Sequence, residues 1–299
     1  MTIGTGNFAE LLWPGIKEIW GTSYNDYEPL YTKIFEVKTS TLRFEKEQGV
    51  TGLGLAGVKN EGSPAAYQDP FQGYQQEYNN ITYALGTTVT REMYEDDQYS
   101  YINEAPEWLA RSMRQTEETI AFNHLNRSVN TAFTGADGVT LLNDSHPLVG
   151  GGTYRNQLSV ASDLTQTSLE TAVQDLMDLV DEQSLKIRVT PECLIVPTSL
   201  NFTARKLLET EFVVGSADND KNTTMGIFKD LVVSPYLTDT DAWYIKTTVP
   251  HGLTWYNRRA AEIVRDNEFD TQNLKFLTTK RFSSDWTDPR GVFGSVGAA

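Results

Sequence analysis

Cysteine and long apolar runs are nearly or wholly missing from this chain of 299 residues. Its single cysteine, Cys193, excludes an intramolecular disulfide framework, suits a reducing cytoplasm, and is expected to be a small buried hydrophobe. No run of about 18 apolar residues is present, so we expect no membrane-spanning helix. The first residues, MTIGTGNFAELLWPG, lack the basic start and apolar block of a secretory signal peptide.

Patterns that would indicate a metal, a cofactor or a catalytic centre are also missing. The three histidines are His124, His146 and His251. They lie far apart, and no His/Cys spacing suits zinc, so we expect neither a metal nor a cofactor. Asp144, Ser145 and His146 are the residue types of a hydrolase triad, but neighbours in one loop cannot easily present nucleophile, base and orienting carboxylate in hydrogen-bonding order. We interpret His146, which precedes Pro147, as a turn residue, and we predict that the chain is not an enzyme.

Positive charge is in short supply as well. The chain has 25 Lys and Arg residues against 40 Asp and Glu residues, a net charge of −15 at pH 7. Because nucleic-acid readers neutralise phosphates with clustered basic residues, this balance argues against sequence-specific recognition of DNA. It is compatible with the wall of a container that should not adhere to its contents, although solubility is the simpler explanation.

The most regular stretch of the sequence predicts one long helix from Glu104 to Phe133. Apolar residues recur along it at spacings of three and four, with Asn103 as the expected N-cap and Gly135 as the expected stop. About 28 residues at about 1.5 Å each make a rod roughly 40 Å long, well beyond the usual soluble helix. His124 lies on this helix and is expected to be a packed or interfacial imidazole. An ordinary core helix of an α/β domain is the simpler alternative.

A second unusual feature is the long gap between two predicted strands, Lys33–Glu47 and Ile81–Arg91. The roughly thirty residues between them are rich in glycine and proline, whereas ordinary hairpin loops have about two to five residues. A two-stranded ribbon with such a long tip is marginal alone in water. We therefore predict that the ribbon projects and is stabilised by a neighbouring subunit. A flexible active-site lid is the alternative.

Aromatic side chains mark the surfaces that would meet that neighbour. The ribbon carries Tyr67, Phe71, Tyr74 and Tyr78. Their apolar area has no obvious partner nearby in the sequence. The N-terminal segment carries Trp13 and Trp20. That segment also needs a surface to lie against, in its own chain or in a neighbour, so all six residues are predicted inter-subunit contacts.

The remainder of the chain predicts a compact α/β layer followed by β structure, which makes the fold class α+β. The expected helices are Leu164–Glu182, with Asp163 as N-cap, and Ser199–Thr210. The expected strands are Glu192–Val196, Leu231–Val233, Trp243–Lys246 and a mostly β region from Trp255 to Phe282. A terminal turn and edge segment end the chain.

The order of these parts resembles the major capsid protein of tailed bacteriophages, a fold shared with encapsulins. CLIVPTSLNFTARKLLET (193–210) resembles the strand and helix of the family's axial domain, and LVVSPYLTDTDAWYI (231–245) its following strand pair. RFSSDWTDPRGVFGS (281–295) resembles the last strand and turn of the peripheral domain. LLNDSHPL (141–148) is similar to a loop of Mu-like head subunits.

This resemblance implies a division of the chain into five parts. They are an N-terminal arm (1–30), an extended β-hairpin loop (31–92), a spine helix of the peripheral domain (93–134), an axial α/β domain (135–254) and peripheral return strands (255–299).

The resemblance also implies a function. Copies of the chain would self-assemble into hexamers and pentamers of an icosahedral head that encloses double-stranded DNA, with the extended loop of one copy across its neighbour. Some relatives cross-link loop lysines to asparagines of a neighbour; Lys46 and Lys59 lie in this region, but no acceptor suggests itself.

Further partners follow by analogy with the family. We expect a separate scaffolding protein, a portal, a decoration protein in some particles, and packaged DNA contacted without sequence specificity. The expected location is the virion capsid, after assembly in the cytoplasm of a host bacterium. Two alternatives stay open: an encapsulin-like nanocompartment shell and a cytosolic enzyme with a lidded pocket.

Overall fold

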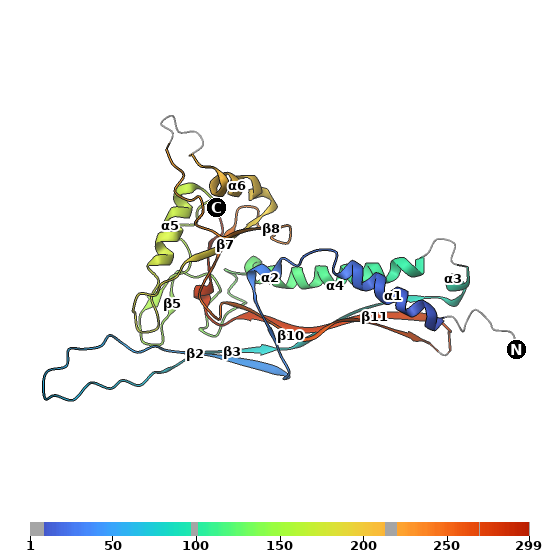
Figure 1. Cartoon of the computed structure of the whole chain (residues 1–299), viewed down its shortest axis with the longest axis horizontal. Coiled ribbons are helices and arrows are strands. Elements are labelled where there is room, and N and C mark those ends of the chain that lie inside the picture. The colour runs from blue at the N-terminus through green and yellow to red at the C-terminus, as the bar shows by residue number, and fades with distance from the viewer. Residues whose placement is uncertain (1–8, 97–100, 213–219, 269, 299) are drawn as a thin grey trace.

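A computed structural model describes residues 9–96, 101–212, 220–268 and 270–298. Figure 1 shows a long, flat layer that carries an upright, compact unit at one end, with a slender loop projecting beyond both. The fold is α+β, as the sequence predicts, and each of its two larger layers is built around one four-stranded sheet. No helix of the described ranges is long and apolar enough to cross a membrane.

The flat layer is built on the sheet that we call the long sheet. Its strands, in spatial order, are β1 (Glu36–Thr39), β10 (Leu253–Asn267), β11 (Leu274–Trp286) and β4 (Ile81–Val89). β1 runs parallel to β10, and the other pairs are antiparallel. The helices beside it are α1 (Ala9–Tyr24), α2 (Tyr31–Ile34), α3 (Arg91–Glu95) and α4 (Tyr101–Asn126). Phe276 and Phe282 of β11 are buried in hydrophobic clusters that also contain residues of α4, so this helix covers one face of the sheet.

The long helix exists, but its ends differ from the sequence prediction. α4 begins at Tyr101, so Asn103 lies inside the helix instead of capping it, and it ends at Asn126 instead of Phe133. The Asn126 side chain donates to the Tyr236 carbonyl at 3.0 Å and accepts from the Thr238 N–H at 3.0 Å. The helix therefore ends where a side chain binds a distant turn, a tertiary contact that periodicity cannot reveal.

The upright unit is built on a second sheet, the compact sheet. Its strands, in spatial order, are β12 (Val292–Ser295), β9 (Trp243–Thr247), β7 (Pro191–Pro197) and β8 (Asp230–Ser234). The predicted strands at 192–196, 231–233 and 243–246 are confirmed. The helices are α5 (Gln166–Met177), η2 (Thr198–Leu200) and α6 (Asn201–Glu209). α5 is shorter than predicted, and its N-cap is Thr165, not Asp163, because the Thr165 hydroxyl accepts from the Ser168 N–H.

The last strand lies in a different sheet from the one that the sequence suggests. β12 pairs with β9 in the compact sheet, whereas residues 255–299 were expected to stay together as peripheral strands. The chain crosses from one sheet to the other at η3 (Pro289–Gly291). An ideal Cβ on Gly252 would lie 2.8 Å from the Cα of Gly291, so only glycine allows the two backbones to approach this closely.

The predicted strand Lys33–Glu47 is two strands in two different sheets. β1 belongs to the long sheet, and β2 (Phe44–Val50) pairs with β3 (Gln72–Asn79) to form the projecting ribbon. The break lies at Ser40, because the buried Asn80 amide donates to Ser40 Oγ at 2.8 Å and to the Leu42 carbonyl at 3.1 Å. The second predicted strand, 81–91, is β4 and pairs with β11 instead of with the first ribbon strand.

Candidate assembly surface

The loop between β2 and β3 exposes apolar side chains that no other part of the described chain covers. Leu55, Val58 and Tyr67 are 84%, 94% and 95% exposed. The base of this loop is closed by three hydrogen bonds. The Thr51 N–H and the Thr51 hydroxyl both donate to the Phe71 carbonyl at 3.0 Å, and the Phe71 N–H donates to Thr51 Oγ1 at 2.7 Å. Beyond that closure the loop reaches past the body (Figure 1). Several large apolar side chains exposed on one loop are typical of an interaction site.

The four ribbon aromatics do not share one environment. Tyr67 and Phe71 are exposed, at 95% and 56%, and are available to a neighbour. Tyr74 is half-buried where the ribbon meets the loop, opposite Gly49. Tyr78 is 1% exposed, so the prediction that it contacts a neighbour is wrong. Its ring lies edge-on to Tyr256, with centroids 5.1 Å apart, and packs inside its own subunit.

The tryptophans of the N-terminal segment pack within the chain to different degrees. Trp20 is buried and stacks on Tyr24 with ring centroids 5.1 Å apart, so it cannot contact a neighbouring copy as predicted. Trp13 is half-buried, with the guanidinium of Arg265 over its ring at 5.2 Å. α1 therefore lies against its own chain, packed on α4 and the long sheet. Ile16 of α1 belongs to the same buried cluster.

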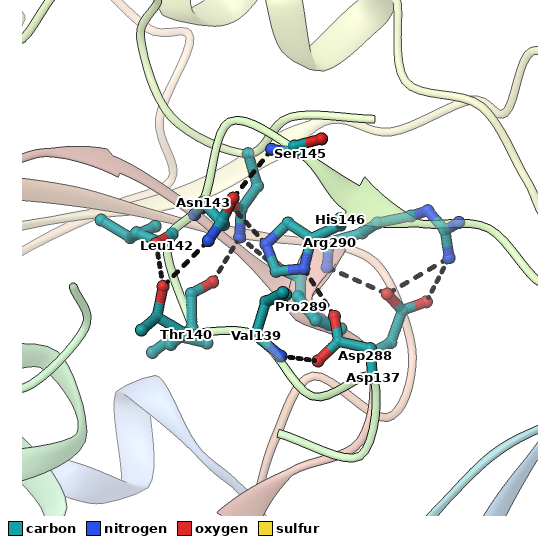
Figure 2. A network of polar contacts seen from close by, with 12 residues as sticks. Asp137, Val139, Thr140, Leu142, Asn143, Ser145, His146, Asp288, Pro289 and Arg290 are labelled. Atoms are coloured by element: carbon teal, nitrogen blue, oxygen red, sulfur yellow. Dashed lines mark hydrogen bonds and ion pairs between the residues drawn. The ribbon is translucent and has the colours of Figure 1, made fainter. Parts of the chain in front are cut away.

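His146 is the centre of a buried polar network at the junction of the two sheets (Figure 2). Its Nδ1 lies 2.6 Å from Asp137 Oδ2, and its Nε2 lies 3.0 Å from Asn156 Oδ1. The sequence predicted that His146 is a turn residue, and this is wrong. His146 belongs to the short strand β5 (His146–Pro147), which pairs with β6 (Thr153–Tyr154). Both ring nitrogens are occupied, and Asp144 and Ser145 are exposed, so these residues form no catalytic triad.

Asn156 holds two separate segments of the chain together in this network. Its Nδ2 donates to the carbonyls of Leu141, Pro289 and Val292 at 2.7, 3.0 and 3.1 Å. Its Oδ1 accepts from the Asn143 N–H at 2.9 Å and faces His146. Because the amide nitrogen faces only carbonyl oxygens, the orientation of this side chain is fixed. The network joins the loop after α4 to the segment that enters β12.

Of the other residues singled out in the sequence, Cys193 is buried, His124 is half-buried and His251 is exposed. Burial raises the pKa of the Cys193 thiol to about 12, and the cysteine packs in β7 as the small buried hydrophobe that was predicted. Burial lowers the pKa of His124 to about 4, and its Nε2 lies 2.9 Å from Ser284 Oγ. His124 is therefore a packed imidazole. In the ranges that the structure describes, no group of three or more potential metal ligands comes together.

The residues that fasten the ribbon to the body were missed in the sequence analysis. Glu47 of β2 accepts hydrogen bonds from three elements of the body, although Glu45 and Glu47 look alike as alternating acids of one strand. The partners of Glu47 lie 9, 209 and 240 positions away in the sequence. No local signal could have distinguished Glu47 from its neighbours.

Comparisons with solved structures show the same fold in viral and virus-like shells. The capsid of cyanophage P-SCSP1u is similar, with 10% identity and a TM-score of 0.62, over 91% of this chain and 88% of that chain. A chain of Microbacterium phage Oxtober96 has 10% identity and a TM-score of 0.57, over 90% of each chain. The virus-like particle from Pyrococcus furiosus has 10% identity and a TM-score of 0.55, over 94% of this chain and 97% of that one.

A family model described as a phage capsid protein matches residues 74–295, well over half of the sequence. No curated protein matches the sequence. The matched region runs from the second ribbon strand through α4 and both sheets to β12. The chain therefore belongs to the phage capsid protein family, and it is a structural protein of the capsid, not an enzyme.

Proposed function

We propose that copies of this chain form the hexamers and pentamers of an icosahedral phage head that encloses double-stranded DNA. In this arrangement the extended loop of one copy lies across a neighbouring copy. The observation that carries the proposal is the loop tip itself, where Leu55, Val58 and Tyr67 are each at least 84% exposed. Burying one such side chain at a subunit contact supplies roughly 1.5–3 kcal/mol. Repetition over every subunit makes this a strong driving force for assembly.

The charge of the chain supports a container that does not read its contents. With a net charge of −15, the wall repels phosphates on average, so packaged DNA is contacted without sequence specificity. A separate scaffolding protein and a portal complete the head during assembly, and a decoration protein is a further partner. Assembly takes place in the bacterial cytoplasm, whose reducing conditions suit a chain with a free thiol, Cys193, and no partner cysteine.

Deletion of the loop tip tests the proposal. Residues 52–70 are replaced by a short Gly-Ser linker, which leaves the Thr51–Phe71 closure in place. Wild-type protein, alone or with its scaffold, is expected to give shells in negative-stain images. The deletion variant is expected to give none, while its circular dichroism and melting curve stay close to those of the wild type.

A matched control changes the same loop without removing apolar area. Lys59→Gln combined with Glu61→Gln alters two exposed polar residues of the tip and should leave the particles intact. Normal shells from the deletion variant would show that the loop is not an assembly element. A monodisperse wild-type monomer at every concentration and salt would refute the proposal as a whole.

An encapsulin-like nanocompartment is the second proposal, and one observation favours it. The chain of the Pyrococcus furiosus virus-like particle is matched over 97% of its length, so a particle described as virus-like can have the same architecture. The contents of purified particles decide between the two. Nuclease-protected DNA of uniform length favours the phage head, and a protein cargo favours the nanocompartment. An enzyme with a lidded pocket is not proposed, since the family is one of capsid proteins.

A further inference from the structure

The carboxylate of Glu47 receives the largest set of hydrogen bonds between the ribbon of β2 and β3 and the body. The Glu47 side chain is 10% exposed. Its Oε1 accepts from Lys38 Nζ at 2.6 Å and from the Tyr256 hydroxyl at 2.6 Å, and its Oε2 accepts from Thr287 Oγ1 at 2.9 Å. These donors come from β1, from β10 and from the residue after β11. His251 Nδ1 also approaches Oε2, at 3.3 Å.

The second ribbon strand is fastened on the same face. The Tyr78 hydroxyl lies 2.7 Å from Thr287 Oγ1, so Thr287 links the carboxylate of β2 to the aromatic ring of β3. Two residues earlier, Gln76 Nε2 donates to Asp285 Oδ2 of β11 at 2.6 Å. The inner face of the ribbon is therefore held by directional polar contacts and one buried ring.

The outer face of the ribbon shows the contrasting case. Lys46 and Glu77 are directly opposite each other across the two strands, with Nζ and Oε2 3.3 Å apart and both side chains nearly half exposed. Exposed pairs of this kind contribute little, whereas hydrogen bonds to a buried charge are among the stronger contacts in proteins. Each face thus carries a paired glutamate, but only Glu47 on the inner face binds the ribbon to the body, whereas Glu77 on the outer face pairs within the ribbon.

Several groups keep Glu47 ionised in this position. Burial alone raises the pKa of a carboxyl group, but the hydrogen bonds from Lys38, Tyr256 and Thr287 more than offset it, and the pKa of Glu47 lies below its usual value. Just beyond, the ribbon narrows at Gly49, where a Cβ on Gly73 would lie 2.7 Å from the Gly49 carbonyl oxygen. The narrow part then passes beside the compact unit, where a Cβ on Gly52 would lie 3.6 Å from Asp181 Oδ2. The angle at which it arrives there depends on how the strands before it are held.

From these contacts we infer that Glu47 is a positioning residue: its carboxylate sets the direction in which the extended loop leaves the body, and so the place where the tip meets the next copy. This inference rests on the proposed function, because it concerns the same loop. A two-stranded ribbon has little rigidity of its own in water. An interaction that fixes its direction before assembly reduces the entropy that docking has to overcome.

Glu47→Gln tests the inference, and Glu77→Gln is the matched control on the opposite face of the ribbon. Loss of the charge-assisted contacts should speed hydrogen exchange of the amides in 44–50 by about tenfold, whereas the control should change it by less than about twofold. Pulsed electron–electron distances between spin labels at Ser63→Cys and Lys229→Cys, in unassembled full-length subunits, should broaden only in Glu47→Gln. Assembled Glu47→Gln particles should vary in size.

The outcomes separate this inference from the proposed function. If Glu47→Gln matches the wild type in both exchange and label distances, Glu47 does not position the loop, whatever the particles look like. A lower melting temperature with an unchanged distance distribution also overturns it, since that is a purely structural role. If wild-type protein never assembles, the proposed function fails while the label distances still report on Glu47. Should Glu47→Gln not fold, Tyr256→Phe removes one donor and keeps the ring, and the same broadening is expected.

Discussion

The buried side chain of Glu118 should make the stability of the subunit depend on pH. This buried carboxylate of α4 accepts from the Leu30 N–H at 2.7 Å and from the Tyr31 N–H at 3.2 Å, and so fastens the chain that enters α2 to the long helix. Burial raises the pKa of Glu118 from its ordinary 4.5 to about 7, although the two backbone donors and Arg114 act in the opposite direction. We predict that Glu118→Gln removes a measurable pH dependence of stability.

The sign and the size follow from linkage. Because the pKa is raised in the folded state, the native protein binds a proton between about pH 4.5 and pH 7 that the unfolded chain does not bind. The stability from this group is therefore fully present below about pH 4.5 and is lost as the pH rises through about 7. A rise from 4.5 to about 7 corresponds to roughly 3 kcal/mol at about 1.36 kcal/mol per pKa unit.

Urea unfolding of dilute, unassembled protein at pH 5, 6, 7 and 8 measures the effect. The unfolding free energy of Glu118→Gln minus that of the wild type should rise by somewhat under about 3 kcal/mol from pH 5 to pH 8. The rise is smaller than the full value because the wild type has already lost part of this stability at pH 5. Glu107→Gln is the control on the same helix, because Glu107 pairs with Arg111 at the surface and its curve should run parallel to that of the wild type. Parallel curves for Glu118→Gln would refute the reasoning and show that its carboxylate ionises as an exposed one does.

Two further predictions concern aromatic and amide side chains. Tyr67→Ala should reduce assembly and leave the melting temperature of the subunit within about 1 °C of the wild type, because the exposed ring touches little in its own subunit. Tyr78→Ala should destabilise the subunit by about 3–5 kcal/mol, because that ring is buried. Equal loss of stability in both variants would contradict the division between tip and root. Asn156→Ala leaves three buried carbonyls without their donor and should cost at least about 3 kcal/mol in urea unfolding, so a loss under about 1 kcal/mol would show that the network is dispensable.

The elements that the sequence predicted well are those with a local cause. After Glu192, β7 is an apolar run buried on both faces, and α5 has the apolar spacing of a packed helix, so both were found. Their ends were placed less well. Where Asn126 ends α4 or Asn80 breaks the predicted first strand, the deciding hydrogen bond comes from residues far along the chain. Helix and strand periodicity contain no information about such partners.

The aromatic residues of the assembly surface also show what the sequence alone cannot predict. Tyr67 and Tyr78 lie on one ribbon and have the same side chain, yet one is almost fully exposed and the other is buried against Tyr256. The difference arises because β3 lies against β11 at its end and leaves the body toward the tip. A pattern of aromatics indicates that apolar area must be covered; only the fold decides whether its own chain or another one covers it.

The chemistry of the loop changes along its length in a way that suits assembly. Its root is held by a charged carboxylate and hydroxyl groups, which form directional hydrogen bonds. Its tip carries apolar side chains, and the hydrophobic attraction between such groups has no preferred direction. Directional contacts at the root allow the tip to be presented in one place, so that a non-directional attraction can still select one site on the next copy. If the chemistry were reversed, an apolar root would tolerate many directions, and a polar tip would gain little from leaving water. Exchanging Leu55 and Val58 for serine should therefore weaken assembly without moving the loop, and Glu47→Gln should move the loop without removing its affinity.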